Sequence, residues 1–162
     1  LSATAGCATR VPRDALAMTG PTLEIRLRST RRFETTDEQK ILSASAGLLQ
    51  DLGFTIDESE TDLGLIVASK ERTAVEGRQV AGKVAMAVIF GADVSIDRNQ
   101  KFRASVVTRP TEKEIVVRVT FQRIVWNDRG QVSRLERLDD PQTYQEFFEK
   151  LSKAVFLEAQ EL

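Results

Sequence analysis

Hydrophobic residues recur at helical spacing in two stretches of the chain, and each stretch has a recognisable start. The first follows Thr36-Asp37-Glu38-Gln39, which has the spacing of a capping box, and ends at Gly53, a common helix stop. The second follows Asp140 and Pro141, which suit the cap and first position of a helix. These patterns predict two amphipathic helices, and the apolar stripe of the second consists of Tyr144, Phe147, Phe148, Leu151 and Val155.

Alternation of apolar and polar residues predicts strands in much of the remaining chain. Residues 24–33 alternate in this way, with Ile25 and Leu27 on one face. Residues 54–56 and 63–68 predict a hairpin whose loop is the acidic stretch 57–62, in which the acids lack the offsets of a calcium loop. The last strand follows a strong turn signal, and the three strands predicted in this part of the chain are 102–108, 115–121 and 132–138.

The order of these elements predicts the fold class. Helices that flank a run of hairpin-connected strands are typical of an α+β protein. We therefore expect a two-layer sandwich with a largely antiparallel sheet of about five or six strands, and two main helices on one face. A further helical segment, rich in Gly and Ala, is expected between the two groups of strands.

The composition excludes several classes of functional site and indicates no particular activity. The 162 residues fit one domain, and 23 basic against 24 acidic side chains leave a net charge of -1, unlike a dedicated nucleic-acid-binding protein. The absence of histidine removes the commonest general base and metal ligand. With a single cysteine, an intrachain disulfide and a thiolate zinc site are also excluded.

The first residues resemble the end of a bacterial lipoprotein signal peptide. Small residues lead into the single cysteine in Thr4-Ala5-Gly6-Cys7, so the resemblance implies that Cys7 is acylated. Ala8 follows in place of the Asp that would suggest retention in the inner membrane, which favours the outer membrane. The chain is then a precursor fragment that lacks the first part of its signal peptide. The alternative is a free cysteine in a disordered tail.

The domain organisation follows from this interpretation. Residues 1–7 are expected to be a signal-peptide remnant with a lipobox-like segment, and residues 8–22 a tether with Pro and Gly but no sustained period. A tether of this length reaches at most about 50 Å. Residues 23–162 are expected to form a single α+β domain close to the membrane.

The segment 74–92 carries small residues four positions apart and an apolar second half. Its uncharged run is too short to span a bilayer, so three interpretations stay open: a third core helix, a helix that docks on a partner, and a segment at the membrane surface. Its glycines weaken an isolated helix, which favours ordering against a neighbour. The residues expected to contact a partner are Gly82, Ala85, Met86, Ile89 and Phe90.

Arginines form a second candidate site. If both helices cover one face of the sheet, the other face is polar and carries Arg26, Arg28, Arg118, and Arg103 or Arg109. Exposed arginines on strands are commonly just solvated, and they discourage edge-to-edge pairing. The functional alternative is an anionic-surface site for lipid headgroups or an acidic protein. Nucleic acid is disfavoured because no exposed aromatics alternate with the arginines.

The sequence contains no catalytic motif. A phosphate-binding glycine loop, a nucleophile elbow and a carboxylate pair in apolar surroundings are all missing, and the pair Asp139-Asp140 is explained by a helix cap. We expect no enzyme activity, no cofactor and no metal.

Two stretches of the chain look like small outer-membrane lipoproteins of Gram-negative bacteria. They are residues 50–55 and the region from Gly130 to Leu157, which includes Tyr144-Gln145-Glu146-Phe147-Phe148. The chain is also similar, more loosely, to accessory lipoproteins of outer-membrane assembly machinery. The resemblance implies a non-catalytic accessory subunit of an envelope assembly, secretion or efflux complex, on the periplasmic face of the outer membrane. The alternative is a periplasmic ligand-binding module for a small molecule or lipid.

Overall fold

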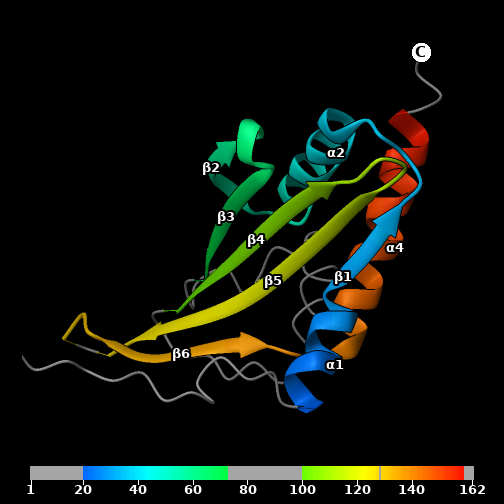
Figure 1. Ribbon diagram of the computed structural model, residues 1–162. Helices are drawn as coiled ribbons and strands as arrows, with labels where there is room; N and C mark the ends of the chain where they lie inside the picture. Colours follow the sequence, from blue (N-terminus) through cyan, green and yellow to red (C-terminus); the bar gives the residue numbers. More distant parts are fainter. Residues whose placement is uncertain (1–19, 73–99, 128, 159–162) are drawn as a thin grey trace, which may run out of the picture.

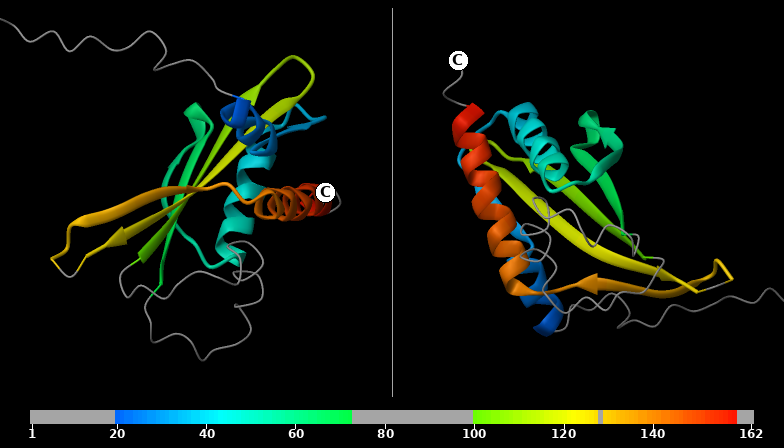
Figure 2. Two further views of the ribbon diagram at one scale, coloured as in Figure 1. Left: turned by 90° about the horizontal axis from the view of Figure 1, so that it is seen from below. Right: turned by 180° about the vertical axis from the view of Figure 1, so that it is seen from behind.

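The computed structural model of the protein describes residues 20–72, 100–127 and 129–158 (Figure 1). Six antiparallel strands form one sheet, in which β1, β5, β4, β3 and β2 lie side by side in that order and β6 also pairs with β5. Helices α2 and α4 pack on the same face of this sheet (Figure 2). The expected α+β sandwich is confirmed, and its elements are α1 (Gly20–Arg28), β1 (Thr30–Phe33), α2 (Glu38–Asp51), β2 (Thr55–Glu60), the 3-10 turn η1 (Thr61–Leu63), β3 (Leu65–Arg72), β4 (Gln100–Pro110), β5 (Ile115–Trp126), β6 (Val132–Leu138) and α4 (Pro141–Glu158).

Strands β1 and β6 share one edge of β5, because β4 occupies the other edge along most of its length. β1 pairs with the first part of β5, where Thr30 lies opposite Arg118, and β6 pairs with the second part, where Leu138 lies opposite Phe121. Ser29 fills the interval, since its carbonyl accepts a 2.9 Å hydrogen bond from the Val119 N–H. The two short strands therefore lie end to end.

The core lies between the helices and the inner face of the sheet. Every second residue of β5 from Ile115 is buried, as its alternating sequence predicts. The aromatic stripe of α4 packs against this row, with the rings of Phe147 and Phe121 5.5 Å apart. The Tyr144 hydroxyl donates a 2.8 Å hydrogen bond to the Leu138 carbonyl. Four residues of the predicted stripe are buried and Val155 is half-buried, so the structural role expected for this helix is confirmed.

Both main helices begin with an acidic cap. Asp37 accepts a 3.0 Å hydrogen bond from the Lys40 N–H, so α2 starts one residue later than a cap at Thr36 would place it. Asp140 accepts 2.8 Å hydrogen bonds from the N–H and the hydroxyl of Thr143. The predicted cap of α4 is confirmed.

Two local predictions are wrong. Residues 24–33 were expected to form one strand, but the structure has the helix α1 up to Arg28 and a strand only from Thr30. In this helix Ile25 is half-buried and Ser29, one turn further on, is buried, whereas Leu27 is 67% exposed, so the two apolar residues of the predicted strand face do not share one face. The acidic stretch 57–62 was expected to be a loop, yet β2 runs through Glu60. It lies at the sheet edge, where exposed charges are tolerated and limit pairing with other chains.

Candidate anion-binding site

The outer face of the sheet, opposite the helices, carries the side chains that alternate with the core residues. Arg103 on β4 points to this face between the buried Phe102 and Ala104, and Arg109 shares its orientation. The register places Arg103, Gln122 and Arg137 in one row across three strands. The expectation of a polar outer face is met by β4, although half-buried apolar residues of β5 also lie there: Val116, Ile124 and Trp126.

The four arginines predicted for this surface occupy different elements. Arg103 and Arg118 lie on the outer face, as expected. Arg26 and Arg28 lie on α1 rather than on a strand. Arg28 forms an exposed ion pair of 3.3 Å with Glu24, four residues earlier on the same helix. Arg26 instead lies close enough to Arg118 to affect its electrostatics.

Three arginines from three elements converge where α1 meets the edge of β5. They are Arg26 of α1, Arg118 of β5 and Arg137 of β6, and we call them the arginine cluster. Ser29 holds the junction together, since its carbonyl binds β5 and its hydroxyl accepts a 3.4 Å hydrogen bond from Arg137 Nη2. Sequence reasoning missed Arg137, because only the pairing of β6 with β5 brings it to this place.

The electrostatics of the cluster are unfavourable. Desolvation lowers the pKa of Arg118, and the positive charges of Arg26 and Arg137 lower it further. The Nε atom of Arg118 is buried and has no hydrogen-bond partner. Arg137 has a carboxylate beside it, with its Nε 3.0 Å from Asp139 Oδ1. Within the described part of the chain, no carboxylate lies at ion-pair distance from Arg118.

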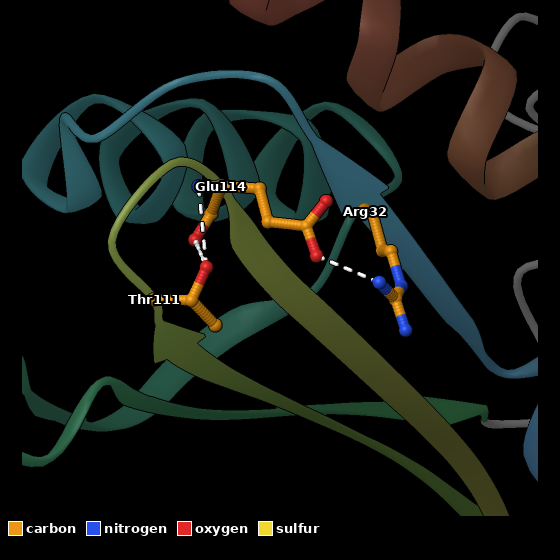
Figure 3. Close-up of polar contacts among 3 residues, drawn as sticks. All are labelled: Arg32, Thr111 and Glu114. Atoms are coloured by element: carbon orange, nitrogen blue, oxygen red, sulfur yellow. Dashed lines mark hydrogen bonds and ion pairs between the residues drawn. The ribbon is translucent and has the colours of Figure 1, made fainter.

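Other arginines of the same sheet are neutralised by the fold. Arg32 on β1 forms a 2.8 Å ion pair with Glu114, the residue that closes the turn between β4 and β5 (Figure 3). Thr111 fixes that turn, because its hydroxyl donates a 2.8 Å hydrogen bond to the Glu114 carbonyl. On the inner face, the buried Arg123 pairs with Glu136 of β6. Arg118 differs from Arg32 and Arg123 because no carboxylate lies at ion-pair distance from it within the described part of the chain.

This arrangement can bind an anion but offers little else chemically. A guanidinium stays protonated and acts neither as a base nor as a nucleophile, whereas it binds carboxylate and phosphate through paired hydrogen bonds. Among the residues that the structure describes, no three acidic, cysteine or histidine side chains are placed to hold a metal ion. No helix in the described ranges is long and apolar enough to cross a membrane.

The other predicted sites lie outside the described residues. These are the acylation site Cys7 and the segment 74–92, with its expected partner contacts Gly82, Ala85, Met86, Ile89 and Phe90. Their roles stay predictions. Comparison of the chain with protein-family models and with curated proteins finds no match.

Proposed function

We propose that the protein is a non-catalytic accessory subunit of an envelope assembly, secretion or efflux complex, held at the periplasmic face of the outer membrane by acylated Cys7. The arginine cluster is the observation that carries the binding role. Like charges held together in a partly desolvated place oppose folding, and a bound anionic group would offset that cost. The chemistry of guanidinium groups supports recognition rather than catalysis.

The outer face of the sheet extends the same surface. Arg103 and Arg109 of β4 are exposed there, and their charges add to the attraction for a negative partner. Exposed charges mainly speed association and orient a partner, while partly buried groups such as Arg118 contribute more to the stability of a complex. We therefore place the centre of recognition at Arg118 and its periphery along β4.

A charge reversal tests the proposal in cells that express the full precursor. Arg118→Glu should abolish the complexes that chemical crosslinking captures with the wild-type protein. Arg129→Glu makes the same charge change at an exposed turn beyond the cluster, and it should leave those complexes intact. If both variants retain the crosslinked complexes, the arginine cluster is not the recognition site.

The anchor is tested separately by cell fractionation. Cys7→Ser should release the precursor into the soluble periplasmic fraction, because acyl chains contribute about 0.8 kcal/mol per buried CH₂. Retention of this variant in the outer membrane would contradict acylation of Cys7. Bulky substitutions at Gly82 or Ala85 test whether the segment 74–92 contacts a partner. They should disrupt the complex while the isolated domain stays folded.

A further inference from the structure

Strand β6 pairs with β5 along one edge, and its other edge meets no strand in the part of the chain that the structure describes (Figure 1). An unpaired edge presents backbone N–H and C=O groups that can bond to a strand of another chain. Among the described strands, β1 and β2 also lie at edges, but β1 has four residues and β2 carries exposed acidic side chains. β6, with seven residues, is therefore the edge best suited to an added strand.

Exposed apolar residues on β6 mark this edge as a contact surface. Leu135 is 62% exposed and Val132 is 57% exposed. Leu135 lies opposite Ile124 of β5, so its side chain points to the outer face of the sheet beside a half-buried isoleucine. Its neighbours Arg134 and Glu136 point to the inner face, where Glu136 forms an ion pair with β5. Burial of Leu135 against another chain would remove apolar surface from water.

The sequence of β6 is complementary to itself when two copies run antiparallel. A two-fold axis through Leu135, perpendicular to the sheet, places this leucine opposite Leu135 of the second copy. The apolar row of Ile124 and Leu135 then continues into the same row of the second copy. Arg134 faces Glu136 of the second copy, and the symmetry repeats this pair, so two pairs of opposite charge form across the contact.

Arg134 and Glu136 are both accessible for this pairing. Arg134 is exposed, and no carboxylate in the described part of the chain lies at ion-pair distance from it. Glu136 pairs with Arg123, but a carboxylate has two oxygens and can accept from two guanidinium groups. The Glu136 side chain is 35% exposed, which leaves it within reach of a second copy.

The charges of β6 also select one register. An axis through Arg134 would place that arginine opposite its own copy, and an axis through Glu136 would do the same for the glutamate. Like charges directly opposite each other on paired strands are destabilising. Of these three registers, the one centred at Leu135 is the one that pairs opposite charges and joins the two apolar rows.

We infer that two copies of this protein associate through β6 into a symmetric dimer with one continuous antiparallel sheet. The helices of both copies then lie on the same face of that sheet. A contact made by one short strand is small, and small interfaces are typical of weak or transient association. We therefore expect a dimer that dissociates on dilution. The inference goes beyond the proposed function and needs neither the anchor nor the arginine cluster.

Analytical ultracentrifugation tests the inference with the full chain carrying Cys7→Ser, which excludes both acylation and an intermolecular disulfide. The parent protein should change from monomer to dimer as its concentration increases. Arg134→Glu turns both opposite-charge pairs into like-charge pairs and should weaken dimerisation about tenfold. Arg109→Glu makes the same charge change on β4, at an exposed position away from β6, and should leave the dimerisation constant unchanged.

Cysteine crosslinking tests the register. Leu135→Cys in the Cys7→Ser chain places the two thiols opposite each other, with Cα atoms about 4.5–5.5 Å apart, which suits a disulfide. Mild oxidation should therefore link this variant into dimers on non-reducing electrophoresis. Val132→Cys is the matched control, because Val132 is similarly exposed but lies three residues from the axis. Its two copies are roughly 20 Å apart in the dimer, so this variant should stay unlinked.

Three results would overturn the inference. They are a parent protein that stays monomeric at every concentration, dimerisation that is as strong in Arg134→Glu as in the parent, and equal crosslinking of Leu135→Cys and Val132→Cys. Circular dichroism should show that every variant is folded, since each substituted residue is exposed.

The two tests are independent of each other and of the proposed function. Crosslinking of Leu135→Cys does not require Arg134→Glu, so it still decides the question if that variant is unstable. Every measurement uses the purified Cys7→Ser chain with Arg118 intact. Failure of the dimer is therefore distinguishable from failure of the anchor or of the arginine cluster.

Discussion

Truncation of Phe148 gives the sharpest test of the packing. This ring is 1% exposed, its centroid lies 5.7 Å from that of Phe147, and the Arg31 guanidinium lies 5.1 Å above it. Phe148→Ala removes these contacts and leaves a cavity that a close-packed core fills only in part, which costs about 3–5 kcal/mol. Since small domains have about 5–15 kcal/mol of stability, urea unfolding followed by circular dichroism should show a large decrease.

The same helix supplies the matched control. Phe156 lies two turns further along α4 and is 62% exposed, so Phe156→Ala should change the free energy of unfolding by less than about 0.5 kcal/mol. The melting temperature of Phe148→Ala should decrease by about 10–20 °C, while that of the control should stay nearly constant. Equal effects of the two substitutions would show that α4 does not bury the face assigned to it.

Three further substitutions test other parts of the structure by thermal unfolding. Gly64 has a φ of +61°, and a Cβ added there would lie 2.2 Å from Thr108 Oγ1. Gly64→Ala should therefore lower the free energy of unfolding by about 2–5 kcal/mol. Gly130→Ala should lower it less, because Gly130 has a similar φ of +72° but open space around it. Burial raises the pKa of Tyr144 in the folded protein, so the neutral phenol stabilises the fold at any pH below its unfolded pKa of about 10. This stabilisation is lost as the pH rises above that value, so the melting temperature should decline at alkaline pH. Tyr144→Phe should make the decline less steep, and an unchanged pH profile of the melting temperature would contradict this. Arg118→Gln removes a like charge from the cluster and should keep or raise the melting temperature; a large decrease would show that Arg118 is structural.

The sequence predicts secondary structure and burial correctly where the periodicity within one element is sufficient to determine them. The stripe from Tyr144 to Leu151 can bury its apolar side only as a helix, and Asp140 with Pro141 marks where that helix begins. The alternation of apolar and polar residues in β5 likewise predicts a strand with one buried face, and the six residues of that face are buried in the structure. Strong periodicity over ten or more residues leaves little freedom.

Short or ambiguous patterns were decided by tertiary contacts instead. Ile25 and Leu27 alternate with arginines over too few residues to separate helix from strand, and the structure has a helix there that contacts α4. The acids of 57–62 suggest a loop by composition, but an edge strand leaves such side chains in water. The arginine cluster could not be predicted as a unit, because its members are separated by many residues and meet only where α1, β5 and β6 come together in the fold.

The surroundings of the Arg118 side chain are unfavourable for the stability of the folded protein. Three arginines in the described part of the chain lose much of their contact with water, and two of them, Arg123 and Arg137, have a carboxylate from the same chain beside them. Arg118 has two further arginines nearby instead. Partly buried charges are ordinarily paired, since removal from water is costly and a like charge increases the cost. A side chain kept in such a position is best explained by an anionic group from outside the described fold, which is the kind of partner that a guanidinium binds.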